Sequence, residues 1–195
     1  CVSVQRVFVH KNIAESFAES LALRAEKLKV GNPTDIKTEV GPLIRPHEVE
    51  RVSDWVEEAR NAGAKIMAGG EKISESCYNP TLIYNPPSEL NVSTKEIFGP
   101  VICIYPYSEI DQAILQANSL PFAFQASVFT TNLDFAMKVY SLLDASAVMI
   151  NDHTAFRVDW MPFAGYRQSG HGIGGIPYTM HEMQIHKMMV IKSDS

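Results

Sequence analysis

The sequence has no long hydrophobic run, no excess of positive charge and no paired cysteines. Its longest apolar stretches, such as Val101 to Tyr105 and Ala145 to Ile150, have the length of strands and fall far short of the roughly 20 residues that span a bilayer. A net charge of -5 provides no basic surface of the kind that counterion release at nucleic acid requires. We therefore expect no membrane insertion and no nucleic-acid binding.

The three cysteines, Cys1, Cys77 and Cys103, lie far apart and form no C-x-x-C pair. This spacing argues against a disulfide scaffold and against a zinc site, so no metal is expected. Unpaired cysteines are typical of a reducing compartment. We expect a cytoplasmic protein.

A hydrophobic content of 46% in 195 residues is enough for one substantial core, or for one large lobe of a bigger protein. The sequence shows no internal repeat, no low-complexity segment and no interdomain linker. We therefore treat residues 1–195 as one domain.

Apolar periodicity predicts strands that alternate with helices. A strand at Arg6 to His10 precedes a helix from about Ile13 to Leu28, with Asn12 as its cap. The other predicted elements are a helix at His47 to Asn61 closed by Gly63, strands at Lys65 to Met67, Pro80 to Tyr84 and Val101 to Tyr105, a helix at Glu109 to Asn118, a strand at Gln125 to Thr130, a helix at Leu133 to Leu143 and a strand at Ala145 to Ile150. Such alternation predicts an α/β fold with a mainly parallel sheet and flanking helices.

Beyond Asn151 the periodicity fades in a glycine-rich stretch, residues 161–178. The phosphate-binding pattern G-x-G-x-x-G is absent, so we expect a tightly folded loop whose glycines allow positive φ and close backbone approach. The final apolar run, His186 to Lys192, is predicted to form a strand that pairs with its own sheet or with another subunit.

Several motifs resemble the aldehyde dehydrogenase superfamily. KEIFGPV at Lys95 to Val101 is the most specific. It is accompanied in the right order by LKVGNPTD, VGPLI, ASVFT and PFAGYRQSGHG, which start at Leu28, Val40, Ala126 and Pro162. The resemblance covers nearly the whole chain and implies a fold of the catalytic-domain type of this family, with the nucleotide-binding domain largely outside residues 1–195.

The family's catalytic cysteine is followed after a few residues by an arginine and a strand, and CVSVQR at Cys1 to Arg6 occupies that place. The resemblance implies that the Cys1 thiolate attacks an aldehyde, that hydride passes to NAD or NADP, and that water hydrolyses the resulting thioester. A cysteine in an apolar run can also be a buried, inert residue. We expect that second role for Cys77 and Cys103.

In similar enzymes the glutamate of this motif binds the hydroxyls of the nicotinamide ribose, which implies a cofactor-binding role for Glu96. Phe98 is expected to pack near the nicotinamide. The alternatives are a solvated glutamate and a core phenylalanine. The resemblance also implies that the general base and the oxyanion asparagine lie upstream of the cysteine, so we expect an isolated 195-residue chain to be essentially inactive.

The segment Asn151 to Phe163 stands where related enzymes line the mouth of the aldehyde tunnel. Phe156 and Phe163 are candidate walls, and Arg157 could accept an aldehyde that carries a carboxylate or phosphonate. Alternatively, Arg157 pairs with Asp159 or with a neighbouring subunit.

Three functions remain open: an NAD(P)-dependent aldehyde dehydrogenase, a coenzyme A-acylating relative, and a non-enzymatic module that keeps the fold. Because similar enzymes are dimers or tetramers, we expect a homodimer or homotetramer.

Overall fold

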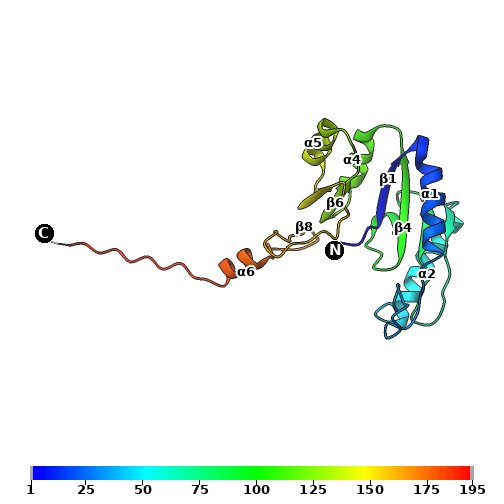
Figure 1. Cartoon of the computed structure of the whole chain (residues 1–195), viewed down its shortest axis with the longest axis horizontal. Helices are drawn as coiled ribbons and strands as arrows, with labels where there is room; N and C mark the ends of the chain where they lie inside the picture. Colours follow the sequence, from blue (N-terminus) through cyan, green and yellow to red (C-terminus); the bar gives the residue numbers. More distant parts are fainter. Residues whose placement is uncertain (1, 194–195) are drawn as a thin grey trace. The chain divides into compact units, whose positions relative to one another are not determined.

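The computed structural model describes residues 2–193 (Figure 1). The chain divides into two compact units, one formed by Val4–Gln116 and the other by residues 2–3 together with 117–193. The boundary falls within helix α4 (Ile110–Asn118). No helix among the described residues has the length and apolar character needed to cross a membrane.

The Val4–Gln116 unit is built on a four-stranded sheet. Its order is β1 (Arg6–His10), β4 (Val101–Tyr107), β3 (Thr81–Tyr84) and β2 (Lys65–Ala68). The central strand β4 runs parallel to both β1 and β3, while β2 pairs with β3 in the antiparallel sense. The predicted α/β fold with a mainly parallel sheet is therefore confirmed, with an antiparallel strand at one edge.

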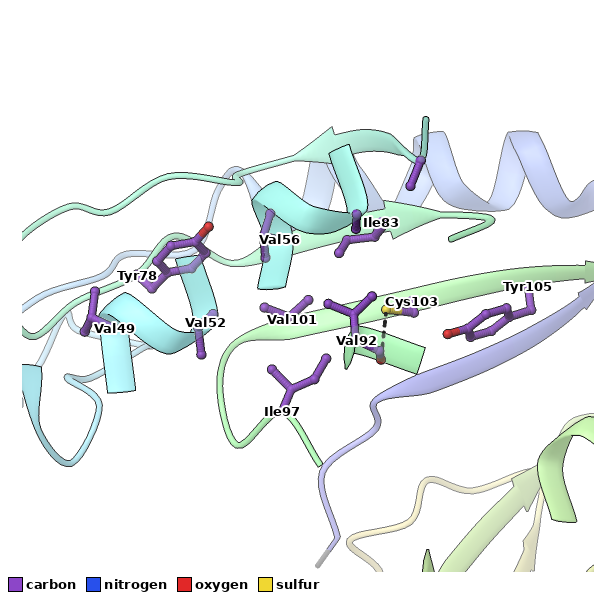
Figure 2. Packing of buried hydrophobic residues seen from close by; sticks show 12 residues of the cluster. Val49, Val52, Val56, Tyr78, Ile83, Val92, Ile97, Val101, Cys103 and Tyr105 are labelled. Carbon is purple, nitrogen blue, oxygen red and sulfur yellow. Dashed lines mark hydrogen bonds between the residues drawn. The ribbon is translucent and has the colours of Figure 1, made fainter. Parts of the chain in front are cut away.

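The two faces of this sheet are covered by different helices. Successive strand residues point to opposite faces, and Ile83 and Cys103 pack in a cluster with helix α2 (Pro46–Asn61) (Figure 2). Their neighbours Leu82 and Ile104 pack instead with helix α1 (Lys11–Ala25). Because each face carries its own helix, the strands can be apolar at consecutive positions, as parallel strands buried on both sides usually are.

Helix α1 contacts the sheet through Ala14, Ala18 and Ala22, which are all buried. Their spacing of four residues places them on one side of the helix, and their small size allows a close approach. The predicted cap was wrong: the helix begins at Lys11 and its N-cap is His10, whose Nδ1 accepts a hydrogen bond from Asn12 N at 3.4 Å. Asn12 lies inside the first turn because the imidazole of His10 already takes the capping position.

Helix α2 buries Val49, Val52, Val56 and Ala59 along one face. Pro46 occupies its first turn, where a missing N–H leaves no hydrogen bond unmade. Gly63 follows its end with φ of +89°, which confirms the predicted glycine terminator.

The second unit contains two short sheets. Strands β6 (Gln125–Val128) and β7 (Ala147–Ile150) pair in parallel and are connected by helix α5 (Leu133–Leu142), which Asn132 caps through a 2.9 Å bond from Phe135 N. Strands β5 (Phe122–Ala123) and β8 (Tyr166–Arg167) pair antiparallel.

The glycine-rich stretch is largely irregular, as expected, but it also contains β8 and leads into a helix that the sequence did not predict, α6 (Ile176–Glu182). Gly175 precedes this helix with φ of +112°. A Cβ at that position would lie 2.7 Å from Met161 O, so the close backbone approach requires glycine.

The predicted C-terminal strand is not paired within the described residues, and its pairing with another subunit stays a prediction. Residues 186–192 run as an extended tail beyond α6 (Figure 1) and pair with no strand among the described residues. The side chains of Met188, Met189, Val190 and Ile191 are 76 to 86% exposed. An extended segment becomes a strand only when its backbone groups pair with a sheet edge.

Candidate functional site

The predicted nucleophile, Cys1, lies outside the described residues, but the segment that follows it is anchored. The carbonyl of Val2 accepts a hydrogen bond of 2.5 Å from Thr154 Oγ1. Thr154 is only 8% exposed and belongs to the loop that follows β7. The hydroxyl therefore ties residue 2 to this loop.

The predicted cofactor residues lie in a loop, Lys95–Pro100, between helix α3 (Asn91–Thr94) and strand β4. Three successive side chains alternate in burial. Ile97 is 1% exposed and joins the core that α2 covers, whereas Phe98 is 69% exposed and Glu96 is also exposed. Burial of Ile97 therefore leaves the two predicted cofactor residues free at the surface.

Two side chains hold this loop through its backbone. The amide of Gln5 donates from Nε2 to Lys95 O at 2.7 Å and accepts at Oε1 from Ile97 N at 2.9 Å. Arg51 donates from Nη2 to Ile97 O at 2.6 Å. The guanidinium of Arg51 is itself held by Glu48 at 2.7 Å and lies 4.4 Å from the ring centre of Trp55.

The loop adopts a backbone that ordinary residues avoid. Phe98 has φ of +49°, which is uncommon for a bulky residue and is maintained only where the surroundings fix it. The next residue is Gly99, where a Cβ would lie 2.9 Å from Cγ2 of Val52. A glycine is therefore needed for the loop to pass close to α2.

Helix α3, which leads into the loop, is held by the sheet on one side and by helix α2 on the other. The hydroxyl of Tyr105 lies 2.8 Å from Ser93 Oγ, and the thiol of Cys103 contacts Val92 O at 3.8 Å (Figure 2). On the α2 side, the carboxylate of Glu58 accepts from Asn91 Nδ2 at 3.0 Å. A helix this short has little stability of its own, so these contacts hold it in place.

The predicted substrate residues lie in the second unit, and the structure brings two of the three together. The guanidinium of Arg157 lies 4.7 Å from the ring centre of Phe163 and donates to Met161 O at 2.9 Å. Phe163 also packs edge-on against Phe124, with 4.8 Å between ring centres. Phe156 is 48% exposed and takes no part in this stack.

Arg157 borders an open depression of about 480 Å³. The depression is also lined by Asp159, by Gly175 before α6, and by Ile176, Thr179, Met180 and Met183. Among the ion pairs described for residues 2–193, none joins Arg157 to Asp159. Its hydrogen bond to Met161 O and its contact with Phe163 hold the guanidinium instead.

Comparison with known proteins shows that residues 1–189 match the model of the aldehyde dehydrogenase family. The chain belongs to this family. Two similar curated relatives are a 3-sulfolactaldehyde dehydrogenase of Priestia aryabhattai, 42% identical over 191 residues, and a lactaldehyde dehydrogenase of Methanococcus maripaludis, 37% identical over 192 residues. Each alignment covers 98% of this chain but only 40 and 41% of the relative.

Solved structures of the family agree with the fold. Aldehyde dehydrogenase 21 from Physcomitrella patens, in complex with the reaction product succinate, has a TM-score of 0.89 at 34% identity and covers 94% of this chain and 38% of its own. Glyceraldehyde-3-phosphate dehydrogenase GapN from Methanocaldococcus jannaschii, complexed with NADP, has a TM-score of 0.88 at 37% identity, with coverage of 94 and 40%. The chain thus spans about two fifths of the length of these aldehyde dehydrogenases.

The sequence pointed to exposed loop residues but not to the side chains that fix those loops through hydrogen bonds to their backbone. The family motif pointed to Glu96 and Phe98, and they share one loop. Gln5, Arg51 and Thr154 were missed because a side chain bonded to a distant backbone group produces no periodic pattern and no local motif.

The two described cysteines have environments that predict inertness. Cys77 is 8% exposed and Cys103 is fully buried, and burial raises the pKa of the Cys103 thiol from 9.0 to about 12. At pH 8 only about one Cys103 in ten thousand would be a thiolate. Unfolding restores the ordinary pKa, so ionisation of Cys103 destabilises the fold as the pH rises above 9.0 and does not affect stability at lower pH.

We therefore expect iodoacetamide at pH 8 to leave Cys77 and Cys103 unmodified in the native protein and to modify both in denaturant, with peptide mass mapping as the measurement. Rapid native modification of Cys103, at the rate of an exposed thiol, would contradict its assignment as a buried structural cysteine.

Proposed function

We propose that residues 1–195 form the cysteine-bearing catalytic lobe of a longer NAD(P)-dependent aldehyde dehydrogenase. The observation that carries this proposal is the fixed loop Lys95–Pro100, which exposes Glu96 and Phe98 in the family's cofactor motif. An exposed aromatic side chain adds little to the core, and bulky residues held at positive φ cluster at functional sites.

The loop fits the nicotinamide end of NAD(P). The carboxylate of Glu96 is exposed, and its backbone is held on both sides; a carboxylate accepts two hydroxyl hydrogen bonds well. Phe98 offers an apolar face next to it. The cofactor, when bound, would supply the hydride acceptor.

In the proposed reaction, the Cys1 thiolate forms a bond to the aldehyde carbon. Loss of hydride from that adduct yields a thioester, and water then releases the carboxylic acid and regenerates the thiol. Thr154 would orient the nucleophile's segment by holding Val2 O. The isolated chain is proposed to be inactive, because the base and the oxyanion donor expected of the family lie outside it.

For the substrate, we propose an aldehyde that carries an acidic group. Arg157 places a guanidinium next to the ring of Phe163, beside an open depression whose remaining lining is mostly apolar apart from Asp159 and Thr179. A guanidinium binds planar or tetrahedral oxyanions through paired hydrogen bonds. The relative named for 3-sulfolactaldehyde and the structure that holds succinate support an anionic substrate, whereas the relative named for lactaldehyde is named for an uncharged aldehyde.

For assembly, we propose a homodimer or homotetramer in which the tail pairs with a second copy. Four consecutive apolar residues, 188–191, are exposed in the single chain, and such a segment is a favourable strand partner.

The function itself is tested in the full-length protein by Cys1→Ala. We expect loss of aldehyde-dependent NAD(P)H formation with cofactor affinity largely retained, measured by absorbance at steady state and by titration. Cys77→Ala serves as the matched control and should retain activity. Turnover by the Cys1→Ala variant would contradict the proposal, and an acyl-coenzyme A product in the presence of coenzyme A would favour the acylating relative.

The anionic substrate is tested by Arg157→Met, which keeps an unbranched side chain beside Phe163 and removes the guanidinium that lies over its ring. We expect kcat/KM for a sulfonated or carboxylated aldehyde to fall about 10- to 100-fold, the loss of a charged hydrogen-bond pair. A neutral aldehyde of equal length should change less than about twofold. Arg24→Met, at an exposed position of helix α1, is the control. Equal losses for both aldehydes would argue against an anion contact.

The tail is tested by deleting Met188 to Ser195 and comparing the result with deletion of Ser193 to Ser195 alone. We expect the longer deletion to shift the assembly to smaller species in light scattering and to lower the thermal midpoint, while the shorter one leaves both unchanged. A full-length protein that is monomeric at micromolar concentration, or normal assembly without residues 188–195, would rule the proposal out.

A further inference from the structure

The peptide groups on both sides of Glu96 are bonded by one side chain. Gln5 Nε2 donates to the carbonyl of Lys95, and Gln5 Oε1 accepts from the N–H of Ile97. A neutral primary amide offers a donor and an acceptor on two separate atoms in one plane. A carboxylate only accepts, an ammonium group only donates, and a hydroxyl does both through a single atom. Gln5 therefore fixes the backbone immediately before and after Glu96.

Gln5 is itself rigidly placed. Its own carbonyl accepts a 2.8 Å hydrogen bond from Cys103 N, which continues the parallel pairing between β1 and β4 by one residue. The side chain is half-buried, and Nε2 makes a second, longer contact of 3.4 Å with Val92 O at α3. Because its backbone is bonded to β4 and its side chain to the loop, Gln5 fixes the loop relative to the sheet.

Arg51, in helix α2, bonds the same loop from the helix side. It bonds the carbonyl of Ile97 at 2.6 Å, so both backbone groups of Ile97 are held by side chains from other elements. The carboxylate of Glu96, in contrast, has no hydrogen bond or ion pair among those described for residues 2–193. Its main chain is fixed while its functional group is left free.

From this geometry we infer that Gln5 is a positioning residue that sets the orientation of Glu96 toward the nicotinamide ribose. The inference rests on the proposed function, because it assigns a role in cofactor placement. Preorganisation of this kind speeds a reaction by holding the reactants in productive geometry, and a misplacement of about 1 Å can cost about a hundredfold in rate.

A purely structural role for Gln5 predicts a different pattern. If the amide only stabilised the fold, its removal would lower the thermal midpoint and reduce activity to the same extent whatever residue stands at position 96. If it acts through Glu96, its removal should have little further effect once the carboxylate is gone, because residues that work through one another are not additive.

The test is a double-mutant cycle in the full-length protein with Gln5→Met, Glu96→Gln and the double variant. Methionine keeps the length and removes both hydrogen-bonding atoms. Hydride transfer is measured in single turnovers with saturating aldehyde, and the NAD(P)+ dissociation constant is measured by titration without aldehyde. Gln112→Met, an exposed residue of α4, is the matched control.

We expect Gln5→Met to slow hydride transfer about 10- to 100-fold in the Glu96 background and less than about twofold in the Glu96→Gln background. Amide hydrogen exchange at Ile97, measured without cofactor, should accelerate in Gln5→Met and stay unchanged in Gln112→Met. Equal losses in both backgrounds, or unchanged rates with normal exchange, would overturn the inference.

Where Gln5→Met fails to fold, Gln5→Glu replaces it: the carboxylate still accepts from Ile97 N but cannot donate to Lys95 O. It is expected to give the same non-additivity, and an additive result would overturn the inference. A wild-type protein that binds NAD(P)+ but does not reduce it would overturn the proposed function instead. The inference would then be decided by the NAD(P)+ dissociation constant: Gln5→Met must weaken binding when residue 96 is glutamate and have little effect in the Glu96→Gln background.

Discussion

Strand β4 is the element on which the Val4–Gln116 unit depends. It pairs in parallel with both neighbours, and its alternate residues enter the two cores: Cys103 and Tyr105 contribute to the α2 side, and Ile104 to the α1 side. The start of this strand also determines where the preceding loop can lie. Ile97 packs into that core, so its two sequence neighbours, Glu96 and Phe98, lie at the surface.

The loop Lys95–Pro100 is therefore ordered by its contacts with the core and with neighbouring side chains. Side chains from two elements, the start of β1 and helix α2, bond its backbone, and Gly99 allows it to pass Val52. Such support is what a site needs when the reacting groups must be in place before the ligand arrives. In the second unit, the side chain of Arg157 is likewise fixed by neighbours, namely the ring of Phe163 and the carbonyl of Met161.

Apolar periodicity predicted the elements that bury a continuous face. Strand β1 was predicted residue for residue, and α2 within one residue, because Val49, Val52 and Val56 repeat at helical spacing. Helix α3 is four residues long, too short for any period to show. The cap of α1 was misassigned because His10 competes with Asn12. The strand predicted at 186–192 is unpaired among the described residues and stays a prediction, because a strand needs a partner that local sequence does not reveal. At the site, Glu96 could be found from a motif, whereas Gln5 could not, since its partners lie about 90 residues away in the sequence.

The central claim is that the loop is arranged, before any ligand binds, to present Glu96 to the nicotinamide ribose. A crystal structure of the full-length protein with NAD(P)+ tests it most directly. The account predicts a carboxylate oxygen of Glu96 within about 2.5–3.0 Å of a ribose hydroxyl, with the bonds from Gln5 to Lys95 O and Ile97 N retained. A ribose bound by other residues, with Glu96 turned to solvent or the Gln5 bonds broken, would contradict it.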